Sequence, residues 1–382
     1  MQIEVCRDCY MDMIYVEDCC EILDFMRVPI TASDRKAGKY PYYGANGIQG
    51  YVADYIFNDE LVLLAEDGGN FGSKEKSIAY RASGKCWVNN HAHVLKPKDN
   101  INVDYLCYSL MFYKVDGLIN GATRKKLTQA AMRKMKIPYR GIEEQLHIVE
   151  ELNHILKIKE HRQQELQLLD NLIKARFVEL FGEPSTNPMG WNETTIGDEC
   201  FYIKDGPHKS IIDIGKENGG HPFISVRNIV NGHIDFSTAR YISDEDYVDA
   251  IKKCHPEKGD MLYSKGGTTG IAKLIDIDEE FANWVHVAVL KFDKSRLNGV
   301  FFENMLNSAY CYEQSQRLTK GIANRDLVLT AMAQIKMYCP PMERQNQFAD
   351  FVHQVDKSKV AVQKALDETQ LLFDSLMQQY FG

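Results

Sequence analysis

The chain has 382 residues, of which 45% are hydrophobic and 26% are charged. This composition excludes a disordered chain and supplies enough apolar surface for two to four domain cores. No apolar run approaches the ~20 residues that a membrane helix needs, and the N-terminal segment lacks an apolar stretch of signal-peptide length. We therefore expect a cytoplasmic protein whose ten cysteines are reduced. The net charge of −8, taken as a total, argues against a nucleic-acid binder, although a total does not describe how charge is distributed.

The sequence repeats itself at an offset of 200 residues. Residues 121–145 align without gaps with residues 321–345, and the register continues to Phe-Gly pairs at 181–182 and 381–382. Weaker matches lie upstream at other offsets, as insertions in loops would cause. They pair 63–72 with 261–270, His91 and Val94–Lys96 with His286 and Val289–Lys291, and 40–42 with 221–223. The repetition predicts two copies of one unit, each a mixed domain followed by a long helix.

The first mixed domain is expected to span residues 1–142. Short strand-like runs punctuated by Gly, Asn and Asp, with one helical stretch near the end, are typical of an α+β domain with a compact sheet. The expected strands are Leu61–Ala65, Trp87–Val88 and His93–Lys96, and the expected helix is Val103–Tyr113.

This domain contains two groups of potential metal ligands. They are Cys6, Cys9, Cys19, Cys20, His91 and His93. The neighbours Cys19 and Cys20 do not easily bind one zinc ion together, so free thiols are favoured over a zinc site. The two histidines alternate on an expected strand and therefore share a face. Because no carboxylate or cysteine is expected near them, we predict packed or surface histidines rather than metal ligands.

A long helix is expected over residues 143–182, where no proline occurs and the first glycine is Gly182. Positions spaced alternately by four and three residues form a heptad seam that is apolar except for three basic residues. The seam comprises Ile148, Leu152, Ile155, Lys159, Arg162, Leu166, Leu169, Ile173, Arg176 and Leu180. A matching seam in an expected C-terminal helix, residues 343–382, comprises Phe348, Val352, Val355, Lys359, Val362, Leu366, Thr369, Phe373, Leu376 and Tyr380. Two such stripes predict an intramolecular antiparallel coiled coil, with packing of each helix on its own domain as the alternative.

Residues 183–342 are expected to form a second α+β domain, after a linker rich in Gly, Pro and polar residues. The expected strands are Phe223–Val226 and Val285–Phe292, and the expected helical stretch is Phe301–Leu318. Pro340 and Pro341 precede the second long helix where Arg140 and Gly141 precede the first, so the two helices are expected to start differently.

Motifs for catalysis or cofactor binding are missing from the sequence. The segment Gly68–Lys74 is close to a phosphate-binding loop, but its last residues stand in the wrong order, and its second copy continues into Ile271-Ala272. No GxGxxG follows an expected strand, no Asp/Asn-Pro-Pro-Tyr/Phe tetrad for methyl transfer to a base occurs, and no hydrolase, metalloprotease or kinase signature is found. We expect no catalytic residue, metal or cofactor in this chain.

Contacts with nucleic acid are the remaining chemistry that the residues favour. The repeated GGxxG segments, 68–72 and 266–270, either let the backbone approach a bulky partner or form tight turns between strands, and the sequence favours neither. Six basic residues and no acid lie between Arg124 and Lys136, which is either a DNA-contacting patch or a solvated face. The candidate DNA-contacting residues are Tyr43, Asn46, Asn70, Lys74, Lys76, Arg124, Lys125, Lys126, His208, Lys209, Arg227, Asn228, Lys265, Thr268, Thr269, Asn324 and Arg325.

The chain resembles the specificity (S) subunits of type I restriction-modification systems over nearly its whole length. The resemblance rests on the duplication, on the two long helices and on several motifs. The motifs are Tyr40–Tyr51 followed by Leu61–Gly68, Lys204–Ser210 and Lys258–Ser264 in the second domain, and Lys136–Gln145 before the first long helix.

The resemblance implies two target recognition domains, each of which reads one half of a bipartite sequence in double-stranded DNA. The helices would fix the distance between the half-sites and dock two methyltransferase (M) subunits, through which restriction (R) subunits join. S-adenosylmethionine, ATP and Mg would belong to those partner subunits, and this chain would be non-catalytic. The alternative class is a coiled-coil structural adaptor that binds protein partners without DNA specificity; a stand-alone enzyme is disfavoured.

Overall fold

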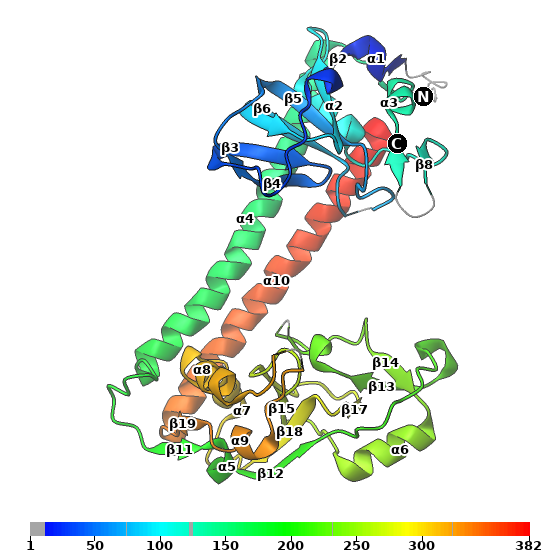
Figure 1. Ribbon diagram of the computed structural model, residues 1–382. Coiled ribbons are helices and arrows are strands. Elements are labelled where there is room, and N and C mark those ends of the chain that lie inside the picture. The colour runs from blue at the N-terminus through cyan, green and yellow to red at the C-terminus, as the bar shows by residue number, and fades with distance from the viewer. Residues whose placement is uncertain (1–11, 74, 122–124, 231, 323) are drawn as a thin grey trace, which may run out of the picture. The chain divides into compact units, whose positions relative to one another are not determined.

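The computed structural model describes residues 12–73, 75–121, 125–230, 232–322 and 324–382 (Figure 1). The chain forms two compact units: unit 1 combines residues 1–163 with 364–382, and unit 2 comprises residues 164–363. Each unit therefore holds one mixed domain and a part of each of two 40-residue helices, α4 (Ile142–Phe181) and α10 (Met342–Phe381). Among the described residues, no helix is long and apolar enough to cross a membrane.

The mixed domain of unit 1 is built around a six-stranded sheet. Its elements are β1 (Met13–Tyr15), α1 (Val16–Cys19), β2 (Cys20–Ile22), η1 (Asp24–Met26), β3 (Ala37–Gly44), β4 (Gly47–Val52), β5 (Phe57–Ala65), β6 (Ala79–Val88), β7 (Ala92–Pro97), α2 (Val103–Met111), β8 (Ile119–Asn120), β9 (Lys126–Leu127), α3 (Gln129–Arg133) and β10 (Lys136–Pro138). The strand order is β2-β7-β5-β6-β3-β4, with small separate pairs β1-β10 and β8-β9.

Strand β5 is the centre of this sheet because its last five residues, Leu61–Ala65, are apolar and fully buried. It pairs antiparallel with β6 on one side and β7 on the other. Such a continuous apolar run is typical of a strand that is covered on both faces. Helix α2 contributes Leu106 and Leu110 to the core that includes Val62 and Leu64. Asn102 caps this helix by accepting hydrogen bonds from the backbone N–H groups of residues 104 and 105.

The mixed domain of unit 2 repeats this plan with its sheet divided. Its elements are β11 (Glu193–Thr195), α5 (Ile196–Glu199), β12 (Cys200–Asp205), η2 (Lys216–Asn218), β13 (His221–Ile224), η3 (Val226–Asn228), β14 (Arg240–Ile242), α6 (Asp244–Lys253), β15 (Met261–Ser264), β16 (Ala272–Leu274), β17 (Ala282–Asn283), β18 (Val287–Phe292), α7 (Gly299–Leu306), α8 (Ala309–Leu318), α9 (Leu329–Met332) and β19 (Lys336–Tyr338). A four-stranded sheet has the order β12-β18-β15-β16, and a three-stranded sheet has the order β14-β13-β17.

The two strand orders correspond element by element. β12-β18-β15-β16 matches β2-β7-β5-β6, and β11-β19 matches β1-β10. In unit 1 the long strand β6 continues until it pairs in parallel with β3, whereas in unit 2 the separate strand β17 pairs in parallel with β13. The predicted α+β class and the internal repetition are thus confirmed.

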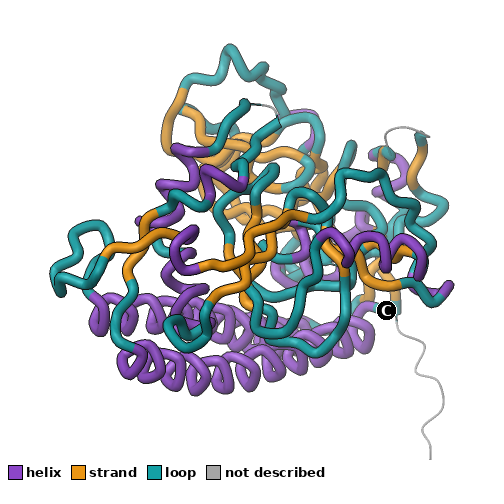
Figure 2. The backbone as a smooth tube through the Cα atoms, turned by 90° about the horizontal axis from the view of Figure 1, so that it is seen from below, coloured by secondary structure: helices purple, strands orange, loops and turns teal. Residues whose placement is uncertain are grey.

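The two long helices run antiparallel within each unit (Figures 1 and 2). In unit 1, Tyr380 Oη donates to Glu151 Oε2 at 2.5 Å, and Lys159 Nζ donates to Gln370 Oε1 farther along both helices. In unit 2, Lys359 Nζ lies 2.7 Å from Asp170 Oδ1. All the predicted seam positions are buried or half-buried, which confirms the coiled coil. Both helices also pack on the helix of their own mixed domain, as the clusters that join Ile148 with α2 and Phe348 with α7 show.

Several local expectations can be compared with these bounds. The predicted strands over Leu61–Ala65, Trp87–Val88 and His93–Lys96 are present. The helical stretch over residues 301–318 is interrupted at Asn307-Ser308. There Ser308 caps α8, and the Asn307 side chain exchanges two 2.9 Å hydrogen bonds with the backbone of Ala272.

The long helices start alike, contrary to expectation. α4 begins one residue after Gly141 and α10 one residue after Pro341, at equivalent positions. A proline is tolerated here because the first backbone N–H groups of a helix have no intrahelical partner. The predicted end of the first helix at Gly182 is confirmed: this glycine has φ +77° and its N–H donates to Val178 O at 2.8 Å.

Candidate nucleic-acid interface

The GGxxG segments lie at the same place in both mixed domains, where they connect antiparallel strands. One connects β5 to β6, and the other connects β15 to β16. Both segments thus lie between strands, but the connection from β5 at Ala65 to β6 at Ala79 is too long for the tight turn that one interpretation expected. In each domain the loop lies beside the segment that leads into the short helix α3 or α9, through the backbone bridges Asp67–Lys126 and Gly266–Asp326.

Backbone hydrogen bonds identify the equivalent residues of the two loops. Leu127 N donates to Glu66 O at 2.8 Å, and Leu327 N donates to Lys265 O at 2.7 Å. Glu66 and Lys265 are therefore equivalent. Two positions further along the chain, Gly68 and Gly267 are equivalent as well. Both of these glycines have φ +70°, a conformation that other residues rarely adopt. The sequence alignment of 63–72 with 261–270 is thus wrong by one residue at the glycines.

In unit 1 this arrangement brings three segments of candidate residues together. They are the β3–β4 turn, the GGxxG loop and the start of β9. Asn46 Nδ2 donates to Gly68 O at 3.1 Å, and Gly68 N donates to Lys125 O at 3.2 Å. Asn70 is half-buried and donates to Ser77 O at 3.3 Å. The side chains of Asn46, Lys76 and Lys125 are exposed, whereas Lys74 and Arg124 lie outside the described residues.

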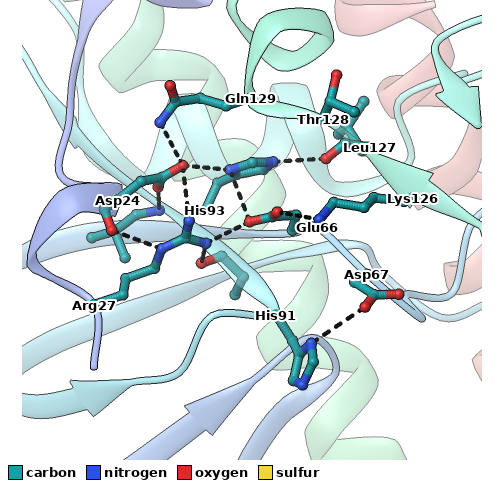
Figure 3. Close-up of polar contacts among 12 residues, drawn as sticks. Asp24, Arg27, Glu66, Asp67, His91, His93, Lys126, Leu127, Thr128 and Gln129 are labelled. Atoms are coloured by element: carbon teal, nitrogen blue, oxygen red, sulfur yellow. Dashed lines mark hydrogen bonds and ion pairs between the residues drawn. The ribbon is translucent and has the colours of Figure 1, made fainter. Parts of the chain in front are cut away.

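A buried ion-pair network lies beneath these loops (Figure 3). Glu66 Oε2 lies 2.6 Å from Arg27 Nη1, and Glu66 Oε1 lies 3.0 Å from Lys126 Nζ. Asp24 Oδ2 lies 2.7 Å from Nδ1 of His93, whose Nε2 lies 2.9 Å from the carbonyl oxygen of Leu127. The network therefore ties η1, the end of β5 and β7 to the start of the basic segment.

The positive groups of this network lower the pKa values of both carboxyls. Burial alone would raise the pKa of Asp24, but the hydrogen bond and charge of His93 outweigh it and hold the pKa below its ordinary value of 3.8. Burial likewise opposes ionisation of Glu66, and the hydrogen bonds from Arg27 and Lys126 keep its pKa below 4.5. Both carboxyls are thus stabilised in the ionised form.

The same network corrects the prediction for the two histidines. His91 lies in the turn before β7, with Nδ1 3.5 Å from Asp67 Oδ2, and only His93 is on the strand. His93 is packed, as predicted, but it has carboxylates beside it. Asp24, Glu66 and His93 could together ligate a metal ion, since their ligand atoms lie within 4.8 Å of one another. Arg27 already supplies positive charge there, so we interpret the group as an ion-pair network.

The cysteines of this domain are consistent with free thiols where they are described. Cys19 and Cys20 are buried and unbridged. Cys6 and Cys9 lie outside the described residues.

In unit 2 the candidates around the loop are mostly bonded to one another. Lys265 is only 5% exposed, with Nζ 2.9 Å from Asp326 Oδ1 and 3.5 Å from Asp205 Oδ2. The buried Thr269 shares a hydroxyl hydrogen bond with Thr319 at 3.0 Å. Arg325 donates to Gln316 Oε1, and the side chains of Thr268 and Asn324 are exposed.

The remaining candidates of unit 2 lie on other loops. His208 and Lys209 follow β12, and Lys209 Nζ lies 2.8 Å from Asp246 Oδ1. Arg227 is exposed and donates to the carbonyl oxygen of residue 238. Asn228 is buried and completes a capping box with Ser225. His208 lies near the residue that precedes the GGxxG loop of unit 2, because His208 Nε2 and Lys265 Nζ lie 4.0 Å and 3.5 Å from the same atom, Asp205 Oδ2.

Four candidate residues have side chains that are buried within the mixed domains. They are Tyr43, Asn228, Lys265 and Thr269. Tyr43 stacks on Tyr80 with ring centroids 5.9 Å apart, so its ring is part of the domain core. The sequence could not show that these side chains are buried, because buried and exposed candidates have similar neighbours along the chain. For these four residues we replace the expected DNA contact with a structural role.

The comparisons with known proteins agree with this arrangement. The family model described as "Type I restriction modification DNA specificity domain" matches residues 11–168 and 188–369, one match in each half. The chain belongs to this family, the type I restriction-modification specificity subunits.

Its relatives cover most of the chain. A putative type I restriction enzyme specificity subunit of Haemophilus influenzae is 27% identical over 88% of this chain and 85% of its own length. The MjaVIII specificity subunit of Methanocaldococcus jannaschii is 22% identical over 93% of this chain and 89% of its own length. Among solved structures, the S subunit from M. genitalium matches with a TM-score of 0.56 at 14% identity, over 100% of this chain and 99% of that one.

Proposed function

We propose that this chain is the non-catalytic sequence-specificity subunit of a type I restriction-modification complex. Each mixed domain reads one half of a bipartite site in double-stranded DNA, and the two long helices set the separation of the half-sites. The candidate contacts at DNA are the exposed members of the predicted set. In the described chain these are Asn46, Lys76, Lys125, Lys126, His208, Lys209, Arg227, Thr268 and Asn324.

One observation carries this proposal: the two mixed domains share a scaffold of strands, but they differ in the segments that follow β3 and β13. Asn89 N donates to Tyr43 O at 3.0 Å, and the equivalent Trp284 N donates to Ile224 O at 2.9 Å. Beyond this shared contact, unit 1 has a tight β3–β4 hairpin, whereas residues 225–230 and 232–239 of unit 2 belong to η3 and longer loops. Equal scaffolds with different polar tips suit two readers of two different half-sites.

Partner subunits are proposed to bind the outer faces of the helices. Leu168 and Leu172 are exposed on α4, and Leu371 and Leu372 are exposed on α10. Exposed apolar side chains beside charged ones are common at protein interfaces. In this proposal two M subunits bind the chain, and R subunits join through them. Those partner subunits bind S-adenosylmethionine, ATP and Mg, and the complex works in the cytoplasm.

The proposal is tested by single-molecule methylation sequencing of cells that carry this gene with its partner genes. We expect a split, asymmetric motif with methylated adenine in both halves, and loss of that motif when the gene is deleted. A methylome without any split motif that depends on this gene would refute the proposal. Gel retardation on random DNA at low and high salt separates it from the adaptor alternative, which predicts no retardation at either salt concentration.

A further inference from the structure

Gln49 is an exposed polar residue at the tip of unit 1 that the predicted contact set does not include. It lies on β4, three residues after Asn46, in the hairpin that pairs Gly44 with Gly47. The Gln49 side chain lies over Gly44, because a Cβ atom placed on Gly44 would come within 2.1 Å of Gln49 Nε2. The absence of a side chain at residue 44 therefore makes room for the amide of Gln49.

The orientation of this amide is fixed by its neighbour Asn89. Asn89 is 3% exposed, and its Oδ1 accepts a 2.8 Å hydrogen bond from the backbone N–H of His91. Its other amide atom must then be the donor Nδ2, which lies 3.3 Å from Gln49 Oε1. One lone pair of the Gln49 oxygen is thus engaged, whereas its NH₂ group makes no hydrogen bond within the described part of the chain and is left to donate to other partners.

We propose that Gln49 reads one base of the half-site recognised by unit 1, and that Asn89 is its positioning residue. This inference rests on the proposed function. An amide whose oxygen is held by a neighbour and whose NH₂ group is left to donate favours acceptors at a base edge, which in the major groove are purine N7, guanine O6 and thymine O4. Lys125 and Asn46 lie on adjacent loops. During this contact Lys125 holds the DNA backbone, and Asn46 holds the GGxxG loop through its hydrogen bond to Gly68 O.

The device is confined to one half-site. The residue equivalent to Asn89 in unit 2 is Trp284, which stacks edge-on against His286 with ring centroids 4.9 Å apart. Tryptophan has one N–H donor and no acceptor, so it cannot orient an amide in this way. A change at Gln49 should therefore alter one half of the split motif and leave the other half as it is.

Three variants of the full chain, each expressed with its partner subunits, test the inference by methylation sequencing. Gln49→Glu replaces the donor with an acceptor, so methylation of the original motif should fall about tenfold, while sites with adenine or cytosine at one position should gain methylation. Asn89→Asp removes the donor that holds Gln49 Oε1. Gln49 then turns over to donate to the new carboxylate, presents its oxygen outward and should produce the same change of preference. Gln49→Ala should relax that one position.

The matched control is Asn58→Asp, which makes the same chemical change as Asn89→Asp. Asn58 is an exposed residue near the start of β5. This substitution should leave the motif unchanged. If Gln49→Glu and Gln49→Ala leave a split wild-type motif unaltered, Gln49 does not read a base, although the proposed function stands. If Gln49→Glu changes one position but a stably expressed Asn89→Asp does not, Asn89 has no positioning role. A wild-type chain without a split motif would instead refute the proposed function itself.

Discussion

Glu66 and Lys265 occupy equivalent backbone positions in the two mixed domains but carry opposite charges. Glu66 pairs with Lys126 at 3.0 Å, and Lys265 pairs with Asp326 at 2.9 Å. Lys126 and Asp326 are themselves equivalent, because each forms the backbone bridge to its GGxxG loop. The ion pair is thus reversed between the domains, while the connection that it makes is retained.

This relationship predicts unequal costs for removing the two charges of the first pair. Glu66→Gln should destabilise unit 1 by about 3 kcal/mol, because Arg27 is left buried without its main partner. Lys126→Met should cost less than about 1 kcal/mol, since that side chain is 49% exposed. Hydrogen exchange resolved by peptide measures both effects, and unit 2 peptides serve as the internal control. Equal losses of protection would contradict the assigned burial of the network.

A second prediction concerns the buried glutamines at the start of the long helices. Gln145 is fully buried; it accepts from Asn102 N at 2.8 Å and donates to the carbonyl oxygens of residues 100 and 140. Gln345 makes the same three bonds with Asn298 N and with the oxygens of residues 296 and 340. Gln145→Leu removes three hydrogen bonds that the buried glutamine makes to backbone groups and should cost about 3 kcal/mol, as should Gln345→Leu.

The measurement for the glutamines is again hydrogen exchange, read at the N-caps Asn102 and Asn298. Gln145→Leu should expose the first turn of α2 and spare α7, and Gln345→Leu should do the reverse. Leu146→Gln is a suitable control, because this neighbour is 50% exposed. A variant that loosens both helices equally would argue against separate clamps.

The third prediction is acid instability that is localised in unit 1. Asp24 and Glu66 have folded-state pKa values below their ordinary values of 3.8 and 4.5, because hydrogen bonds and nearby cations outweigh burial. The unfolded chain therefore binds more protons around pH 4, so the stabilisation is complete above the ordinary values and is lost as pH falls through the folded ones. Protection of β5 and β7 measured from pH 7 to pH 3 should fall at the acid end. Glu66→Gln should show a smaller dependence, and an unchanged dependence would contradict the assignment.

The fourth prediction separates phosphate contacts from structural lysines. Lys125 is exposed, and only its backbone oxygen serves the loop, so Lys125→Ala should weaken binding to all DNA sequences alike. The slope of log K against log salt should become less steep by about one. The exposed helix residue Lys157 provides the control, Lys157→Ala, which should not change the slope. Lys265→Ala should instead lower stability, because Asp326 loses the cation 2.9 Å away and Asp205 keeps only Lys253 as a close cationic partner.

The sequence predicted best where the structure is periodic. The heptad seam fixed both long helices and their pairing, because each position repeats a constraint that its neighbours also carry. The ungapped match of 121–145 with 321–345 likewise placed the start of each helix. The single helical stretch predicted over residues 301–318 is divided at Asn307-Ser308, where a contact with Ala272 ends one helix and the Ser308 cap begins the next.

The candidate site was predicted less well, for a physical reason. The GGxxG loops differ in length by one residue between Gly68 and Gly72 and between Gly267 and Gly270, so matching adjacent glycines misaligned them. Burial of Lys265 depends on Asp205 and Asp326, which lie far from it in the chain. Local composition carries no signal for such tertiary partners. A charged residue directly after a run of buried apolar residues, as Glu66 follows Leu61–Ala65, is the kind of signal that could have indicated the network.

Unit 1 is not a continuous piece of the chain. Its apolar cluster combines Ile148 and Leu152 of α4 with Phe373 and Met377 of α10. During synthesis the first mixed domain therefore leaves the ribosome with one face uncovered, and that face stays open until residues 364–382 have been made. The intervening unit 2 must emerge in the meantime. Slowed translation of that region, or a premature stop within it, should thus prolong the binding of chaperones to the first domain.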